Sequence, residues 1–237
     1  MKAIILNSGM GSRLEELTEN VPKSMININN NQTIFSKTIN TLKNFNIDEF
    51  IITTGYLKNV LKDYALNNFP DINFTFVDNP VYDSTNYIKS LDYIEDDITD
   101  DLLLLHGDLV FDEEVVTKLI KSNKSSMVVD SQTNIPQKDF KAKVVDGQIK
   151  QVSVDYFGDD ALACQPLYKL LNKDWIVWKK KIREYCDEGN TNVYAEEALN
   201  ELLYDKVSID AMDIQGYYCS EIDTKEDLRR YQDKFGE

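Results

Sequence analysis

The sequence has 237 residues, with 26 Lys and Arg against 41 Asp and Glu, which gives a formal net charge of −15. A chain of this length can fold without disulfides or a structural metal, and 42% apolar residues exclude wholesale disorder. The acidity argues against nucleic acid or an anionic membrane as a partner, because clustered Lys and Arg hold both. A small anionic ligand in a locally basic cleft is still compatible with this charge.

The cysteines and the apolar runs indicate the cellular compartment of the protein. Cys164, Cys186 and Cys219 are far apart and odd in number, which favours reduced thiols and a cytoplasmic location. The N-terminal apolar run AIIL is too short for a signal peptide, and no stretch approaches the roughly 20 apolar residues of a membrane span. The single histidine, His106, argues against a His-based metal site or a Ser-His-Asp triad.

The first half of the chain alternates short β-branched runs with amphipathic stretches. This alternation predicts an α/β fold around a largely parallel sheet. Strands are expected over 2–6, 49–56, 72–79 and 100–111, and helices over 34–45, 57–66 and 86–94.

Beyond about residue 110 the pattern changes. Antiparallel strands are expected over 125–132, 140–153 and 162–168, with an Asp146-Gly147 hairpin turn inside the second. Helices are expected over 174–186, 195–205 and 224–235, the last capped by Thr224, and a strand or two over 207–223. Without repeats or Pro- or Ser-rich linkers, the chain is predicted to be one domain, 1–237, with halves 1–115 and 116–237.

The segment LNSGMGSRLEELTENVPKSMI, residues 6–26, is the most informative. Glycines after a buried strand let backbone N–H groups turn toward a phosphate, and Arg13 adds charge-assisted hydrogen bonds. Lys23, ten residues later, is a second cation for the same ligand. Leu14 replaces the third glycine of a Rossmann fingerprint, and the GK[ST] of a Walker A loop is missing.

The string G-x-G-S-R-L followed by T-x-x-x-P-K resembles the sugar-phosphate nucleotidyltransferase-like group, which couples an NTP to a phosphorylated small molecule. Similar blocks follow at IITTGY (51–56), NPVYDSTNYIKSL (79–91), HGDLVF (106–111), VYAEEALN (193–200) and SEIDTKEDL (220–228). These blocks are most similar to the phosphocholine and 2-aminoethylphosphonate cytidylyltransferases.

The resemblance implies a Rossmann-like, GT-A-type α/β fold. Its mixed, mostly parallel central sheet would be flanked by helices and carry a small antiparallel subregion on the acceptor side. Residues 1–115 would bind the nucleotide and residues 116–237 the acceptor.

Two carboxylates point to a metal. Asp108 stands at the end of the most apolar strand, where open α/β sheets present ligands, and Asp223 opens the last helix. Such a pair suits Mg²⁺, which takes one or two carboxylates plus phosphates and water, and the resemblance implies that these two residues hold it. The neighbouring His106 is expected to hydrogen-bond to backbone at the strand end.

The resemblance also implies a reaction in which an acceptor phosphate or phosphonate oxygen attacks the α-phosphorus of CTP and pyrophosphate leaves. Lys23 would neutralise charge at the α-phosphate and Arg13 would hold the pyrophosphate, so both are catalytic candidates. The acceptor is already ionised at neutral pH, so no general base is needed. The other nucleotide-binding candidates are Leu6, Asn7, Gly9, Gly11, Ser12, Gly55, Tyr56, Ser84, Thr85, Asn86 and Gly107.

Acceptor-binding residues are less sharply indicated. Lys141 or Lys143 is a candidate for the acceptor phosphate, with an exposed strand lysine as the alternative; Glu196 or Glu197 is a candidate for an amine, with a solvated helix face as the alternative. Lys89 stands where the group commonly has an aromatic residue, so it joins the acceptor candidates. The segment ALACQPLYK has no tryptophan for a quaternary ammonium, which argues against choline.

We therefore expect a Mg²⁺-dependent cytidylyltransferase that makes a CDP-linked small molecule for cell-surface glycan or lipid modification. The alternatives are a sugar-1-phosphate nucleotidyltransferase using UTP or dTTP and a catalytically silent nucleotide-binding regulatory protein. The expected partners are CTP or another NTP and a small phosphorylated acceptor, without nucleic acid or membrane, on a monomer or homodimer.

Overall fold

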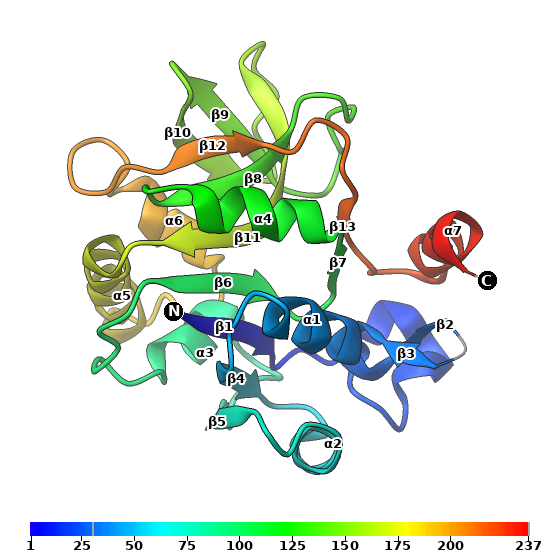
Figure 1. The fold of residues 1–237 in the computed structure, drawn as a ribbon. Coiled ribbons are helices and arrows are strands. Elements are labelled where there is room, and N and C mark those ends of the chain that lie inside the picture. The colour runs from blue at the N-terminus through cyan, green and yellow to red at the C-terminus, as the bar shows by residue number, and fades with distance from the viewer. Residues whose placement is uncertain (30, 237) are drawn as a thin grey trace.

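A nine-stranded sheet forms the centre of the computed structural model, which describes residues 1–29 and 31–236 (Figure 1). The strand order is β5-β4-β1-β6-β11-β8-β12-β10-β9, so strands from both sides of residue 115 share one sheet. These strands are β1 (Lys2–Asn7), β4 (Glu49–Thr54), β5 (Asn73–Asp78), β6 (Leu102–His106), β8 (Ser126–Asp130), β9 (Lys141–Val145), β10 (Gln148–Ser153), β11 (Ala161–Leu170) and β12 (Asp210–Asp213).

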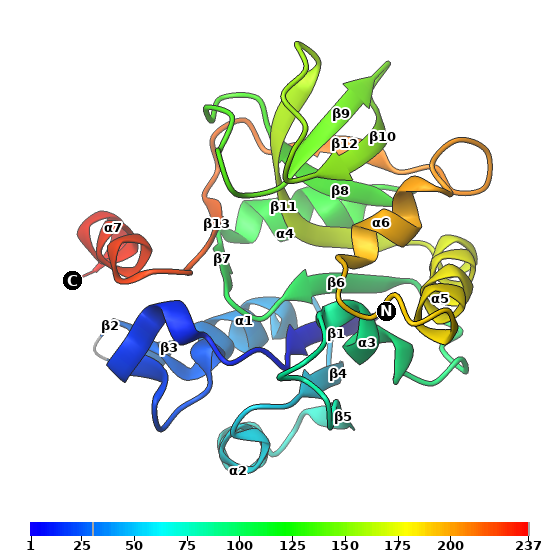
Figure 2. The ribbon, with the colours of Figure 1, turned by 180° about the vertical axis from the view of Figure 1, so that it is seen from behind.

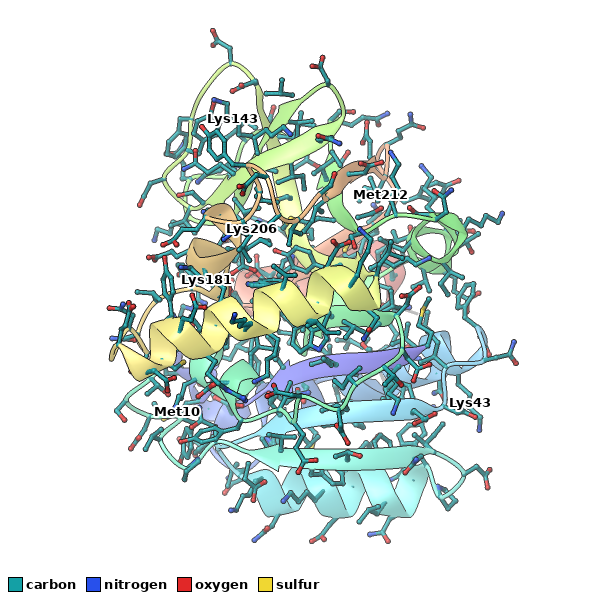
Figure 3. The ribbon with its side chains drawn as sticks, turned by 90° about the vertical axis from the view of Figure 1, so that its left-hand side faces the viewer. Met10, Lys43, Lys143, Lys181, Lys206 and Met212 are labelled. Atoms are coloured by element: carbon teal, nitrogen blue, oxygen red, sulfur yellow. The ribbon has the colours of Figure 1, made fainter. Side chains whose placement is uncertain are left out.

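Helices cover both faces of the sheet. They are α1 (Ile34–Lys43), α2 (Lys58–Asn68), α3 (Tyr87–Asp92), α4 (Glu113–Lys121), α5 (Asn172–Asp187), α6 (Ala195–Asn200) and α7 (Lys225–Phe235), with 3-10 turns η1 (Ser12–Thr18) and η2 (Lys23–Met25). Helices α1, α2 and α4 pack on one face, and α3, α5 and α6 on the other (Figures 1 and 2). Figure 3 looks onto the face that α5 crosses. Within the described residues, no helix is long and apolar enough to cross a bilayer.

The parallel part of the sheet follows from unbroken apolar strands. β1 lies between β4 and β6, and β4 pairs with β5, all in parallel. Along β1, Ala3 and Ile5 join the core under α1 and α4, while Ile4 joins the core under α3 and α5. Because both faces of such a strand are buried, it shows no polar alternation. The predicted α/β fold is confirmed.

Strand β11 changes the character of the sheet. Its C-terminal half pairs antiparallel with β6, and its N-terminal half pairs antiparallel with β9, while β8 flanks it on the other side. The pairings β11–β8–β12–β10–β9–β11 therefore form a closed ring. The sheet is mixed, and the antiparallel region expected on the acceptor side is continuous with it.

Two local predictions are confirmed by the backbone. Asp146 and Gly147 join β9 to β10 and have φ values of 51° and 75°. Positive φ at both central residues is the conformation of a type I′ two-residue hairpin turn. Thr224 caps α7, and its side chain exchanges hydrogen bonds with Asp227 in a capping box.

Two predicted boundaries were wrong. The single strand expected over 100–111 is broken at Gly107 and Asp108 into β6 and a separate strand, β7 (Leu109–Phe111). The turn brings Gly107 against Asn7, where a Cβ would lie 2.1 Å from Asn7 Oδ1, so this position requires glycine. The helix expected over 195–205 ends at Asn200 and continues as turns.

Three buried lysines bind backbone carbonyls instead of facing water. Lys169 Nζ donates to the carbonyls of Ile120 and Ser122 at the end of α4. Lys179 Nζ donates to the carbonyl of Asp92 at the end of α3, at 2.9 Å. Lys141 Nζ donates to the carbonyls of Pro136 and Gln137, in the segment that leads into β9. These contacts satisfy carbonyls that a helix or loop leaves unpaired.

Candidate active site

A short antiparallel ribbon brings Asp108 and Asp223 together. Asp108 immediately precedes β7, and Asp223 lies just beyond β13 (Cys219–Glu221), which pairs with β7. The Ile222 backbone N–H donates to the Asp108 carbonyl at 3.0 Å. Both carboxylates therefore lie at the same end of the ribbon, although more than a hundred residues separate them in the sequence.

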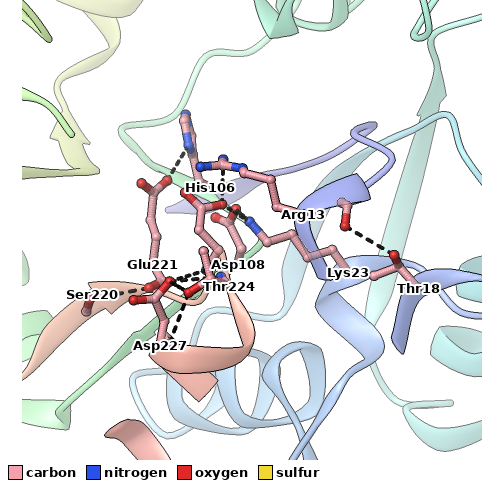
Figure 4. A network of polar contacts seen from close by, with 11 residues as sticks. Arg13, Thr18, Lys23, His106, Asp108, Ser220, Glu221, Thr224 and Asp227 are labelled. Carbon is pink, nitrogen blue, oxygen red and sulfur yellow. Dashed lines mark hydrogen bonds and ion pairs between the residues drawn. The ribbon is translucent and has the colours of Figure 1, made fainter. Parts of the chain in front are cut away.

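Lys23 lies between these two carboxylates (Figure 4). Its Nζ donates to Asp108 Oδ2 and to Asp223 Oδ1, and Arg13 Nη2 lies 2.9 Å from the same oxygen of Asp223. Burial lowers the pKa of Lys23, but the charges of Asp108 and Asp223 outweigh it and raise the pKa overall. Burial raises the pKa of Asp108, and the Lys23 charge more than reverses this. The side chain of Lys23 is therefore a protonated ammonium at neutral pH.

The same carboxylates are suited to a divalent cation. Asp108 Oδ1 is buried and has no hydrogen-bond partner among the described residues, so it has a free ligand position. Asp108 and Asp223 also converge on one cation already, the Lys23 ammonium. Two converging carboxylates, one of them with an unpartnered oxygen, match the donor set that Mg²⁺ takes together with substrate phosphates.

His106 contacts a carboxylate, so the expected bond to backbone was wrong. Its Nδ1 lies 2.9 Å from Glu221 Oε1, and its ring and that of Tyr87 form a T-shaped pair with a centroid distance of 4.7 Å. Burial lowers the pKa of His106, but the hydrogen bond and charge of Glu221 raise it above its ordinary value. Ligand atoms of His106, Asp108 and Glu221 lie within 4.8 Å of one another.

A first cavity of about 350 Å³ opens at the carboxyl ends of β1 and β6, the place where open α/β sheets bind ligands. It is lined by Leu6, Asn7, Ser8, Gly9, Pro22, Lys23, Ser24, Asn79, Tyr82, Thr85, Asn86, Tyr87, Ser90, His106, Gly107, Asp108 and Asn192. The structure thus brings seven of the nucleotide-binding candidates to this cavity: Leu6, Asn7, Gly9, Lys23, Thr85, Asn86 and Gly107.

A second cavity of about 310 Å³ adjoins the first. Its lining comprises Gly9, Gly11, Ser12, Arg13, Lys23, Tyr87, His106, Asp108, Asp139, Phe140, Val154, Tyr194, Glu221 and Asp223. The two cavities share Gly9, Lys23, Tyr87, His106 and Asp108. A ligand in each cavity would therefore meet the other at Lys23 and Asp108.

Three nucleotide-binding candidates lie outside both linings. Gly55 packs beneath Tyr82, and a Cβ there would come within 2.7 Å of the Tyr82 side chain. Tyr56 donates its hydroxyl to the Glu19 carbonyl at 3.0 Å, and Ser84 donates to the Val81 carbonyl at 3.2 Å. These residues support the loops around the first cavity.

Buried polar side chains connect the elements beneath the first cavity. Ser8 donates to Thr53 at 3.0 Å, Ser90 donates to Ser8 at 2.9 Å, and Asn79 Nδ2 donates to Ser90 at 3.0 Å. The network joins β1 and β4 to α3. Sequence reasoning missed Asn79 and Ser90 as cavity residues, although both belong to the NPVYDSTNYIKSL block.

The acceptor candidates are not gathered at the second cavity. Lys141 is fully buried, and its Nζ donates to the carbonyls of Pro136, Gln137 and Val154. Burial lowers the pKa of this ammonium. Lys143 lies on the β9–β10 hairpin, toward the top of Figure 3, with Nζ 4.0 Å from Asp160.

Two further acceptor candidates lie away from both cavities. Lys89 pairs with Asp92 at 2.7 Å, and Glu197 is exposed on α6. Glu196 is buried at 2% exposure behind the cavity wall, where it accepts hydrogen bonds from the hydroxyls of Tyr87 and Tyr168. Burial and the Glu196 charge raise the pKa of both tyrosines well above the ordinary value.

Aromatic and acidic residues that the sequence did not single out form the wall of the second cavity. Phe140 and Tyr194 meet edge to face at a centroid distance of 5.0 Å, and Tyr87 and Tyr194 lie 6.0 Å apart. Asp139 and Glu221 lie beside them. Asp139, Phe140 and Tyr194 come from loops, Tyr87 from the start of α3 and Glu221 from the end of β13, so these residues share no spacing pattern. The only signal in the sequence was the tyrosine in the VYAEEALN block.

The glycine-rich loop, the paired carboxylates and the two adjoining cavities at the carboxyl ends of the strands form a site suited to a phosphorylated ligand and a cation. A family model described as nucleotidyl transferase matches residues 2–140. The chain belongs to this family and is a nucleotidyltransferase.

Similar proteins are known both by sequence and by structure. CTP:phosphoglutamine cytidylyltransferase of Campylobacter jejuni is 30% identical, covering 96% of this chain and 98% of its own length. Choline-phosphate cytidylyltransferase of Streptococcus pneumoniae is 25% identical, covering 88% and 94%. The structure of a CTP:phosphocholine cytidylyltransferase from the latter organism superposes with a TM-score of 0.77 at 19% identity, covering 98% of each chain.

Proposed function

We propose that this protein is a Mg²⁺-dependent cytidylyltransferase that joins CTP to a small phosphorylated or phosphonate-bearing amine and releases pyrophosphate. The observation that carries the proposal is the position of Lys23. It lies where the two cavities meet and between two carboxylates. The nucleoside of CTP would occupy the first cavity, and its phosphates would extend past Lys23 to the Gly11–Arg13 loop at the entrance of the second cavity. The aromatic and acidic wall of the second cavity would hold the acceptor.

The chain's own residues would promote transfer by positioning and charge. Lys23 would leave its two carboxylates and neutralise the α-phosphate, while Arg13 and the Gly11 and Ser12 backbone would hold the pyrophosphate. The acceptor oxygen is ionised at neutral pH, so the site needs no general base. Mg²⁺ held by Asp108 and Asp223 would supply charge neutralisation at the phosphates.

The second cavity favours an amine as acceptor. The aromatic rings of Tyr87, Phe140 and Tyr194 attract a cation at their faces, and Asp139 and Glu221 add negative charge beside them. The relatives named above act on phosphoglutamine and choline-phosphate, and a synthase from Streptomyces rubellomurinus that is 26% identical forms CMP-5'-(3-aminopropyl)phosphonate. The ALACQPLYK segment, which has no tryptophan, does not line the second cavity, so phosphocholine belongs among the acceptors to be tested.

A pyrophosphate-release screen tests the proposal. Each of CTP, UTP, dTTP and ATP is paired, with Mg²⁺, with phosphocholine, phosphoethanolamine, 2-aminoethylphosphonate, phosphoglutamine and glucose-1-phosphate. We expect turnover with CTP and at least one amine acceptor, and a CDP- or CMP-linked product by mass spectrometry. Such a product would serve cell-surface glycan or lipid modification.

Two results would overturn the proposal. Turnover only with UTP or dTTP and the sugar phosphate would assign the sugar-1-phosphate reaction instead. Binding of nucleotide without turnover of any pair would indicate a regulatory protein.

A further inference from the structure

Buried polar atoms without partners are concentrated at the first cavity. Among the described residues, four buried side-chain atoms have no hydrogen-bond partner: Asn7 Nδ2, Ser24 Oγ, Asp108 Oδ1 and Asp210 Oδ1. The first three belong to residues that line the first cavity. A buried polar atom without a partner is costly, and native proteins keep few of them. Asp108 Oδ1 is suited to the cation described above, and the other two atoms indicate that a ligand in the first cavity completes the hydrogen bonds of Asn7 Nδ2 and Ser24 Oγ.

The backbone of Asn7 is fixed by the sheet, whereas the amino group of its side chain has no hydrogen-bond partner among the described residues. Asn7 ends β1, is 8% exposed, and its backbone N–H donates to Thr53 Oγ1 at 3.1 Å. The carboxamide lies against Gly107, another residue of the first cavity. Rotation about the terminal bond of an Asn side chain is soft and roughly two-fold, so a half-turn can present the amino group to a ligand there.

Ser24 is buried to a similar degree. It follows Lys23 in η2 and is 2% exposed. A hydroxyl can donate one hydrogen bond and accept others, and this one does neither within the described residues.

The position of Asn7 and Ser24 relative to Lys23 identifies which part of a nucleotide they would meet. Lys23 and Asp108 line both cavities, whereas Asn7 and Ser24 line only the first. With the α-phosphate at Lys23, the nucleoside occupies the part of the first cavity away from the second. Ring carbonyl, ring nitrogen and ribose hydroxyl groups are the matching partners for an amide and a hydroxyl.

We infer that the side chains of Asn7 and Ser24 bind the nucleoside half of the substrate nucleotide. The inference rests on the proposed function and adds two side-chain contacts to the backbone contacts expected from the glycine-rich loop. Both residues are binding residues, and the ligand removes the cost of their unpaired atoms.

Binding titrations test this inference. Wild type, Asn7→Ala, Ser24→Ala and the control Asp210→Asn are titrated with CTP and with inorganic tripolyphosphate, both with Mg²⁺, and melted without ligand. We expect each cavity variant to weaken CTP about 5- to 10-fold, the loss of one hydrogen bond, and to leave tripolyphosphate affinity unchanged. The melting temperature should stay within about 2 °C, because the removed atom had no partner.

The control variant and the outcomes distinguish failure of this inference from failure of the proposed function. Asp210 carries the remaining unpaired atom but lies on β12, outside both cavities, so its variant should bind CTP normally. If both cavity variants keep wild-type CTP affinity, or lose tripolyphosphate equally, the inference is wrong and the proposed function stands. If wild type binds no nucleotide, the proposed function itself fails. Two independent positions keep the test informative should one variant melt early.

Discussion

At the scale of single residues, Lys23 occupies the position between two carboxylates that would otherwise repel each other. Replacing it by Met should lower the melting temperature by about 5 °C without metal, because Asp108 and Asp223 lose their shared partner. Added Mg²⁺ should then raise the melting temperature more in Lys23→Met than in wild type. Turnover should fall by about 10²-fold or more. An equal Mg²⁺ shift in both proteins would contradict binding of the ion by this pair.

Glu196 positions Tyr87 in the wall between the cavities. Glu196→Gln leaves one tyrosine hydroxyl facing an amide N–H, so a buried donor loses its acceptor at a cost of about 1–3 kcal/mol. We expect a melting temperature lower by about 4 °C and a higher KM for the acceptor. Glu197→Gln, on the exposed face of the same helix, is the matched control and should change neither. If both variants raise the acceptor KM equally, Glu196 does not act through Tyr87.

Asp78, which lies outside both cavities, makes a pH-dependent contribution to the stability of the fold. Burial raises the pKa of this carboxyl, but hydrogen bonds from Lys62, Thr54 and Lys58 outweigh it and lower the pKa to about 2. Because the folded pKa lies below the unfolded value of about 3.9, the stabilisation is complete above pH 4 and is lost as pH falls toward 2.

The test compares melting temperatures across pH. The Asp78 side chain is 36% exposed, so screening keeps the effect small. Asp78→Asn should melt about 1–3 °C lower at pH 7, and the difference should roughly halve by pH 3. The exposed Asp63→Asn serves as control. A difference that grows on acidification would show that the pKa is not depressed.

At the scale of elements, Lys141 fastens the segment between β8 and β9 to the end of β10. That segment carries Asp139 and Phe140 into the second cavity, and Val154 lines the same cavity. Lys141→Met keeps the volume but removes the donor to three carbonyls. We expect the acceptor KM to rise about tenfold while the KM for CTP is unchanged.

Lys143→Met is the matched control for this experiment, since Lys143 is two residues along the same strand and was an equal candidate in the sequence. It should leave both KM values near wild type. A higher acceptor KM for Lys143→Met alone would instead assign the acceptor phosphate to Lys143.

Also at the scale of elements, the sequence predicted the parallel half of the sheet because buried strands such as β1 are continuously apolar. It did not predict the ring of strands. Along one edge β11 pairs first with β9 and then with β6, and this change of partner depends on tertiary packing, which produces no periodic pattern in the sequence. Arg13, Lys23, Asp108 and Asp223, which the structure brings together, were found through compact motifs. Their neighbours in the second cavity, Phe140 and Tyr194, come from loops, where no spacing rule applies.

At the scale of the whole molecule, the net charge of −15 acts against an anionic substrate. The cations at the junction, Arg13 and Lys23, already contact carboxylates. CTP affinity should therefore depend strongly on Mg²⁺, falling about 100-fold when EDTA replaces the metal in isothermal titration. Micromolar binding of CTP without metal would contradict this expectation.

The ribbon of β7 and β13 also sets the order in which the site is assembled during synthesis. Lys23 and Asp223 are 200 positions apart, so a ribosome adding about 5–20 residues per second needs roughly 10–40 s to travel between them. Most strands of the sheet are made in that interval. We therefore expect the nascent protein to acquire its catalytic centre late, in the single event that docks β13 against β7.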